Sequence, residues 1–378
     1  MTLFLIVGLF MYIMNKTFKI PFGISRRFGI LHIWLFLVLF ISVTPVEAAT
    51  AIDNDGSVTG SQNKVLQDST GEFWAIWYES NNRVWITRTD NGVWQTKQLL
   101  AGPSGSGAFT TFTNPADVAV CWNTTRTRLH VILYSTLTET RYTTLLNLAN
   151  WNQSAAWVAN DESTQGSSSI SNRAPGYFEC EVDSANNIYV VLFDWDTTSA
   201  RALKRQVDSP FTWTESSDLG FGTIVRGMAL TVTSNNKIYV ASTHTSYSGS
   251  VAVVDSTNPS DITAFSSPLL VINRGGGASA YDASIMERSN NTLVVFSDVV
   301  NYGAFWNYYN GASWTQGTTG SNTGVSDAGT NPTGVSQRRA LLRDGLNETY
   351  VGYYNSSGSG YHIKLFNYRR LPLPCLST

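Results

Sequence analysis

The feature that most constrains this chain is a repeated, strand-like sequence motif. Three clear copies begin at Ser184, Ser234 and Ser289, and each sets a polar, Asn-containing turn before an apolar run. Looser copies extend the set to six apolar segments, which begin at Phe73, Leu129, Ile188, Ile238, Leu293 and Thr349. The intervals between these starts are 56, 59, 50, 55 and 56 residues. A period of this length indicates a repeat architecture.

A second set of positions supports the alignment. The residue eight positions before each segment is apolar in all six copies: Val65, Cys121, Cys180, Leu230, Ile285 and Leu341. Each repeat is therefore predicted to begin with a buried strand, to turn through polar residues and to return as the apolar segment. A third strand follows, as in 83–89 or 250–256, and a fourth often begins at a Trp.

Four short antiparallel strands in about fifty residues are the unit of a β-propeller blade. The predicted fold is all-β: a six-bladed β-propeller of four-stranded antiparallel blades over residues 49–370, followed by a tail at 371–378. The last repeat has only three strands, and residues 49–57 are expected to supply its outer strand and close the ring. A two-sheet sandwich and a seven-bladed ring are the alternative architectures.

Residues 1–48 are predicted to be an export segment. Basic residues precede an apolar run at 29–43, and the small-residue pattern Val46-Glu47-Ala48 follows it. This order is typical of a secretory signal cleaved after Ala48. The run is shorter than the roughly 20 apolar residues that a membrane anchor needs. The mature protein is therefore expected to be secreted, periplasmic or on the cell surface, with no stable membrane span.

Charge and cysteine content limit the partners. The formal net charge is −2, so the sequence predicts no surface for nucleic acid. Three cysteines form neither a disulfide framework nor a zinc pattern, and no metal or cofactor is predicted. Cys121 and Cys180 occupy the same position of adjacent repeats. A disulfide between them is conceivable, but such inner strands are often too far apart, and the sequence favours two small buried side chains.

One repeat carries motifs of a known superfamily. Arg173-Ala174-Pro175 precedes an inner strand, where sialidases have Arg-Ile-Pro. Asp208, Thr212 and Trp213 stand at the positions of the Asp box, Ser-x-Asp-x-Gly-x-Thr-Trp, although Gln206 replaces its Ser and Pro210 its Gly. The chain thus resembles the sialidase (Asp-box, or BNR) β-propeller superfamily in degenerate form. The resemblance covers the propeller as a whole, and no single motif is intact.

This resemblance implies a site for a glycan, including acidic sugars, at the axial face. Sialidases bind a sugar carboxylate through three arginines, and guanidinium groups suit bidentate bonds to carboxylates. Four arginines lie in segments that lead from one blade into the next: Arg173, Arg226, Arg274 and Arg338. They precede the apolar segments by 15, 12, 19 and 11 residues, so their spacing is irregular. Arginines that only cap strand ends would look the same.

The catalytic residues of such a site are less evident. A sialidase uses a Tyr–Glu nucleophile and an Asp as acid/base. Glu179 and Glu181 are expected on one side of their strand, opposite Cys180. They are the candidate carboxylates together with Asp282, and Tyr281 lies near an arginine in sequence. No Tyr has a Glu at a spacing that marks it as activated, so no nucleophile is assigned.

Aromatic residues add a second way to bind sugars. Trp195 and Trp306 are the candidates for exposed rings that stack on a sugar. The sequence therefore predicts an exported sialidase-like propeller that binds or hydrolyses glycans. The alternatives are a lectin or adhesion module that binds sugars between blades without turnover, and a scaffold for protein partners. Nothing in the sequence indicates an oligomeric state.

Overall fold

The structure is a computed structural model, and every residue that it describes belongs to one unit, residues 55–378. The described residues are 64–79, 81–105, 107–108, 115–135, 140–158, 162–163, 179–194, 199–206, 213–222, 225–244, 250–272, 280–289, 291–299, 303–314, 340–343, 349–355 and 362–367. The predicted signal, the strand expected at 49–57 and the tail at 371–378 lie outside these residues. Among the described residues, no helix combines the length and the apolar character that a membrane span needs.

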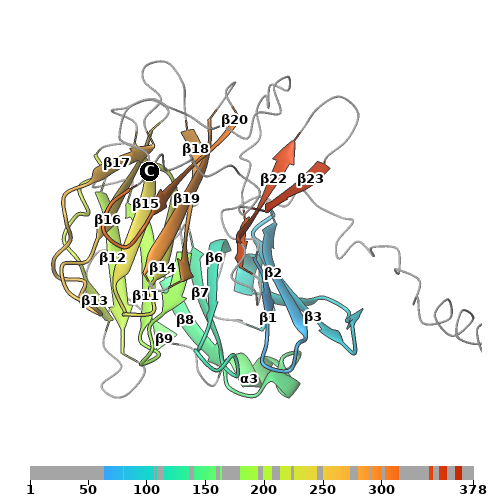
Figure 1. The fold of residues 1–378 in the computed structure, drawn as a ribbon. Coiled ribbons are helices and arrows are strands. Elements are labelled where there is room, and N and C mark those ends of the chain that lie inside the picture. Colours follow the sequence, from blue (N-terminus) through green and yellow to red (C-terminus); the bar gives the residue numbers. More distant parts are fainter. Residues whose placement is uncertain are drawn as a thin grey trace, which may run out of the picture. The chain divides into compact units, whose positions relative to one another are not determined.

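The described part of the chain forms six antiparallel sheets in chain order (Figure 1). The first sheet consists of β1 (Lys64–Gln67), β2 (Phe73–Glu79), β3 (Arg83–Asp90), β4 (Val93–Trp94) and β5 (Gln98–Ala101). The second consists of β6 (Pro115–Trp122), β7 (Leu129–Ser135), β8 (Thr140–Leu145) and β9 (Glu162–Ser163). The third consists of β10 (Glu179–Val182), β11 (Ile188–Asp194), β12 (Ser199–Arg205) and β13 (Trp213–Glu215).

The fourth sheet consists of β14 (Val225–Val232), β15 (Ile238–His244), β16 (Ser250–Asp255) and β17 (Leu269–Ile272). The fifth has β18 (Ala280–Ser289), β19 (Thr292–Val299) and β20 (Gly303–Tyr309). The sixth has β21 (Ala340–Arg343), β22 (Thr349–Asn355) and β23 (His362–Asn367). The helical elements are short: η1 (Pro103–Gly105), η2 (Leu148–Asn150) and α3 (Ser154–Val158). All six predicted apolar segments are strands, and five of them begin at the predicted residue.

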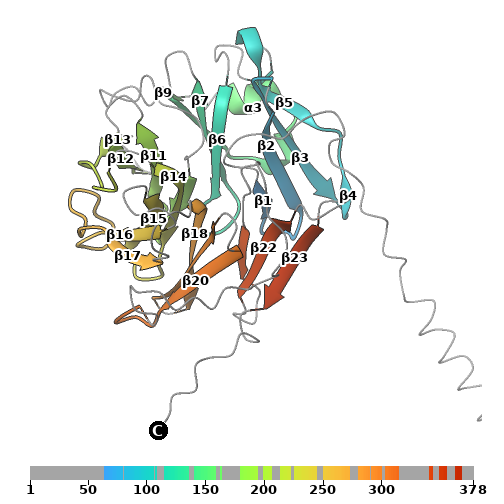
Figure 2. The same ribbon diagram turned by 90° about the horizontal axis from the view of Figure 1, so that it is seen from above.

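The first five sheets pack face to face in chain order, and each described apolar core is shared by two of them. One core joins the first and second sheets, another the second and third, another the third and fourth, and another the fourth and fifth. The opening strands of successive sheets also contact one another: β6 with β10, β10 with β14, β14 with β18, and β18 with β21. Figure 2 shows the opening strands β6, β14 and β18 among them. This serial packing of small antiparallel sheets is propeller-like. Closure into a six-bladed ring stays a prediction.

The polar turn of the repeated motif links each hairpin to the next sheet. The residue just before the motif caps the turn, as Asp183 does by accepting hydrogen bonds from the Ala185 and Asn187 N–H groups, both at 2.9 Å. The next residue reaches the following sheet, where the Ser184 N–H donates to Asn236 Oδ1 at 2.9 Å. Asn236 has a φ of 65°, a left-handed conformation that Asn tolerates better than most residues.

The other turns repeat this link. The Ser69 N–H donates to the Arg126 carbonyl at 3.2 Å, and the Thr124 N–H donates to Asn186 Oδ1 at 2.8 Å. The Ser234 N–H donates to Glu287 Oε2 at 2.9 Å. The repeated motif therefore forms a hydrogen-bonded link between sheets.

Candidate functional site

Most of the predicted site residues cannot be placed in a described site. Arg173, Arg274, Arg338 and Trp195 lie outside the described residues. Four others lie in strands whose backbone is described but whose own side chains are outside the described part: Arg226 in β14, Tyr281 and Asp282 in β18, and Trp306 in β20. The arginine ring at the axial face therefore stays a prediction.

The predicted carboxylates on β10 are described. Cys180 lies in the core shared with the second sheet, and Glu179 points to the fourth sheet. This confirms the expected alternation along the strand. Glu179 Oε2 accepts a hydrogen bond from the Leu230 N–H at 2.7 Å. The Glu179 carboxylate thus ties the third sheet to the fourth.

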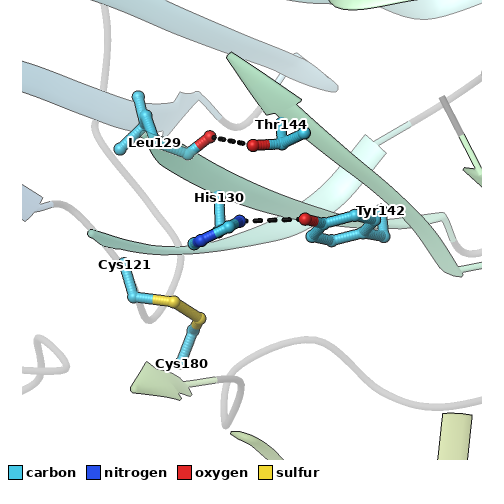
Figure 3. Close-up of a disulfide and its surroundings, with 6 residues drawn as sticks. All are labelled: Cys121, Leu129, His130, Tyr142, Thr144 and Cys180. Atoms are coloured by element: carbon cyan, nitrogen blue, oxygen red, sulfur yellow. Dashed lines mark hydrogen bonds between the residues drawn. A yellow bond between two sulfur atoms is a disulfide. The ribbon is translucent and has the colours of Figure 1, made fainter. Parts of the chain in front are cut away.

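The predicted pair of small buried cysteines is wrong, because Cys121 and Cys180 form a disulfide (Figure 3). Their Cα atoms lie 5.5 Å apart, within the range that a disulfide requires. The physical reason is the turn between β6 and β7. In the third sheet Val182 pairs with Ile188 and leaves a turn of residues 183–187, whereas Trp122 pairs with Leu129 and leaves the longer turn 123–128.

This one-residue difference decides which way the cysteines face. A shift of one residue in strand register moves a side chain to the other face of the sheet. Cys180 pairs with Val190, the third residue of its apolar segment, and both lie in the core shared with the second sheet. Cys121 pairs instead with His130, the second residue of its segment. Cys121 therefore faces the third sheet and meets Cys180.

The disulfide lies at the inner end of two cross-strand rows. In the third sheet, one row runs from Cys180 through Val190 and Leu203 to Glu215. In the second sheet, the matching row runs from Cys121 through His130 to Thr144. Because directly paired residues point to the same side of an antiparallel sheet, both rows face the interface between these two sheets.

A cluster of polar and aromatic side chains occupies this interface around Tyr142. His130 Nδ1 and the Tyr142 hydroxyl form a hydrogen bond of 2.9 Å, and their rings stack with centroids 5.9 Å apart (Figure 3). The Arg205 guanidinium lies 4.3 Å from the centre of the Tyr142 ring. Trp213 meets the same ring edge-on at 5.9 Å. His130 and Arg205 are only 1% and 3% exposed.

Two buried ring nitrogens in this cluster have no hydrogen-bond partner among the described protein atoms: His130 Nε2 and Trp213 Nε1. Burial, together with the positive charges of Arg128 and Arg205, lowers the pKa of His130 to about 3. The imidazole is therefore neutral near pH 7. Five other buried side-chain atoms in the described part of the chain also lack a hydrogen-bond partner, so these two nitrogens are a candidate ligand contact only together with the polar groups beside them.

An ion pair lies on the same face, closer to solvent. Arg201 Nη1 lies 3.2 Å from Glu215 Oε1, and the two side chains are 25% and 14% exposed. Arg201 pairs with Leu192 and Glu215 with Leu203, both of which belong to the core shared with the second sheet. We call His130, Tyr142, Arg201, Arg205, Trp213 and Glu215 the inter-sheet site.

The inter-sheet site is suited to binding. It offers a guanidinium, a carboxylate and ring N–H groups next to aromatic surface, a set that can both donate to and accept from hydroxyl groups. No group of three or more His, Cys, Asp or Glu within the described part of the chain could hold a metal ion.

Of the site residues, the sequence pointed only to Trp213, as part of the Asp box and as the start of a fourth strand, and β13 does begin there. One available signal was the strand 201–205, where Arg201, Leu203 and Arg205 alternate with Ala202 and Lys204 and so share one side. No sequence pattern indicates that this side meets Tyr142, which comes from the preceding sheet.

Comparisons with known proteins bear on the fold alone. No protein-family model matches the chain, and no curated protein matches it in sequence. A protein of unknown function from Dyadobacter fermentans aligns with a TM-score of 0.55 and 11% identity, over 82% of this chain and 94% of its own. AofleA from Arthrobotrys oligospora aligns with a TM-score of 0.52 and 10% identity, over 80% and 82%. A triple arginine-to-alanine variant of AofleA gives 0.51, with the same identity and coverage.

Proposed function

We propose that the protein is a glycan-binding, propeller-like protein that holds a sugar at the inter-sheet site without turnover. The observation that carries the proposal is the pairing of a partly exposed Arg–Glu pair with two buried, unpartnered ring nitrogens on one face. This is the lectin alternative that the sequence left open.

The chemistry of the site fits a sugar. Adjacent hydroxyl groups can accept from the Arg201 guanidinium and donate to the Glu215 carboxylate, and hydrogen bonds to charged partners are the stronger kind. The apolar face of a sugar ring can lie on the partly exposed ring of Trp213. A ligand oxygen in reach of the Trp213 N–H would supply the partner that it lacks in the protein.

The proposal includes export, which the predicted signal supports. It also includes a preference for acidic sugars, which the arginines that lead into the blades support. Hydrolysis of a sialoside at the axial face is the alternative implied by the resemblance to sialidases. Release of fluorophore from a fluorogenic sialoside by purified protein, lost in Arg173→Ala, would support that alternative.

Binding can be tested by surface plasmon resonance on immobilised gastric mucin, before and after removal of its sialic acid. We expect Arg201→Ala and Glu215→Gln to weaken retention at least tenfold, since each removes one charged hydrogen-bonding group. Lys237→Ala is the matched control, because Lys237 pairs with Asp255 at 2.5 Å in the fourth sheet with similar exposure. Equal retention of all four proteins would overturn the proposal.

A further inference from the structure

We infer that the Cys121–Cys180 disulfide is a positioning element of the inter-sheet site, so that glycan binding requires its oxidised form. The inference rests on the proposed function, and it concerns how that site is regulated. It starts from what the bond joins: the opening strands of the two sheets that carry the site, at residues 59 apart in sequence.

The cross-strand rows connect the bond to the site residues. From Cys180 the row reaches Glu215 at the far side of the third sheet, and from Cys121 it reaches His130 on the neighbouring strand. Strands paired in a ladder move together, so the bond sets the separation of Glu215 and His130 across the interface.

Other ties between these two sheets lie away from the site. The Thr124 N–H and hydroxyl both bond to Asn186 Oδ1, at 2.8 and 2.9 Å, and both residues belong to the hairpin turns. The sheets also meet through the apolar core, whose members include Ile132, Ile188 and Leu203, and through the ring contacts of Tyr142 with Arg205 and Trp213. Apolar packing is non-directional, so it does not fix the polar groups of the site in register as a covalent bond does.

Preorganised groups bind more tightly, because less ordering is left to occur on binding. Reduction by a dithiol converts the bond to two thiols: two electrons and two protons pass to the cysteines, and the dithiol closes to its own disulfide. The half-cystines are 5% and 0% exposed, so reduction requires the two sheets to separate locally. Separation would release Arg205 and Trp213 from Tyr142.

The test compares mucin retention of oxidised protein, dithiothreitol-reduced protein and the Cys121→Ala/Cys180→Ala variant, at a temperature where circular dichroism shows folded protein. We expect at least tenfold weaker retention in the last two, and recovery when the reduced wild type is reoxidised. Leu230→Ala is the control. Leu230 occupies the position of Cys180 in the next sheet, and its loss should lower the melting temperature while leaving mucin retention unchanged.

The outcomes separate the two proposals. If Arg201→Ala loses retention while the reduced and cysteine-free proteins keep it within twofold, the positioning role is overturned and the proposed function stands. If oxidised wild type is not retained on mucin, both are overturned. If the reduced and cysteine-free proteins are both unfolded at every temperature, the bond serves the stability of the fold, and a specific positioning role is overturned.

Discussion

The two faces of the third sheet differ in whether their buried polar groups have hydrogen-bond partners. On the face toward the fourth sheet, the Tyr189 hydroxyl and the Ser260 hydroxyl donate to Asp183 Oδ2, at 2.8 and 3.0 Å. Lys204 Nζ donates to the Ser260 carbonyl at 2.5 Å and lies 5.6 Å from the centre of the Tyr189 ring. On the face toward the second sheet, His130 Nε2 and Trp213 Nε1 are buried without protein partners.

On the face toward the fourth sheet, these polar groups form a network in which each has a hydrogen-bond partner. We call this the saturated face, and the pKa values of its groups agree with that description. Burial raises the pKa of the Asp183 carboxyl, but hydrogen bonds from Asn187, Tyr189 and Ser260 outweigh it and leave the pKa below its usual value. Burial also raises the pKa of Tyr189 well above its usual value. Fully partnered polar groups serve the architecture, whereas partnerless ones on the opposite face indicate a place for a ligand.

The largest effect is expected from breaking the disulfide on the unsaturated face. Removing a bond that closes a loop of about 60 residues should cost about 4 kcal/mol of unfolding free energy on the chain-entropy estimate. Urea denaturation of Cys121→Ala/Cys180→Ala against oxidised wild type measures it. The difference should vanish when wild type is denatured in dithiothreitol, and a difference that persists there would point to lost packing instead.

On the saturated face, Asp183→Ala should cost about 2–3 kcal/mol of unfolding free energy. The change leaves the turn without its cap and the Tyr189 and Ser260 hydroxyls without their acceptor. Urea denaturation measures the loss. Asp261→Ala is the control. Asp261 accepts from the Thr263 N–H and hydroxyl in an exposed turn, and its loss should cost under about 1 kcal/mol. Equal losses would show that the network adds nothing.

The contrast between the faces also marks the limit of sequence reasoning. The repeat predicted the strands well, because alternation and polar turns are local properties. It assigned both cysteines to one repeat position by counting eight residues back from each apolar segment. That count missed the additional residue in the turn 123–128, which turns Cys121 toward Cys180. One residue in a turn was enough to change a pair of separate thiols into a bond.

The inter-sheet site was harder to predict for a different reason. Arg205 and Trp213 pair across adjacent strands, which a register count could have found. Their meeting with Tyr142 depends on how two sheets pack, and no spacing in the sequence encodes that distance. The predicted arginines of the axial face stay untested, as do Tyr281 and Asp282, since their side chains lie outside the described residues.

Lowering the pH is expected to reduce the unfolding free energy by an intermediate amount, because of the buried His130. Its pKa of about 3 in the folded protein lies below the usual value near 6.5 in the unfolded chain. The contribution of the neutral His130 to the unfolding free energy is therefore fully present above about pH 6.5. It falls as the pH drops toward 3, because the unfolded chain takes up a proton that the buried ring does not. The loss should approach about 2 kcal/mol at pH 5, at about 1.4 kcal/mol per pH unit.

Urea denaturation of wild type and His130→Phe at pH 7.5 and pH 5 checks this. The variant loses the hydrogen bond to Tyr142 at both pH values, so only the pH dependence is diagnostic. We expect a flatter dependence in the variant. An unchanged dependence would mean that the buried ring is not the group responsible.

The smallest effect on stability is expected from Trp213→Phe, and it is the sharpest test of the comparison. The substitution removes an N–H that has no protein partner and keeps an aromatic ring against Tyr142, but it loses part of a ring that packs on the core. The unfolding free energy should therefore fall by no more than about 1 kcal/mol. Tyr189→Phe removes a single polar group from the saturated face and should cost about 1–2 kcal/mol, since Asp183 then loses a donor. Mucin retention should respond in the reverse order, weakened by Trp213→Phe and unchanged by Tyr189→Phe. If Trp213→Phe destabilises the protein as much as Tyr189→Phe and leaves retention unchanged, the Trp213 N–H is structural, and the two faces do not differ in the way that we infer.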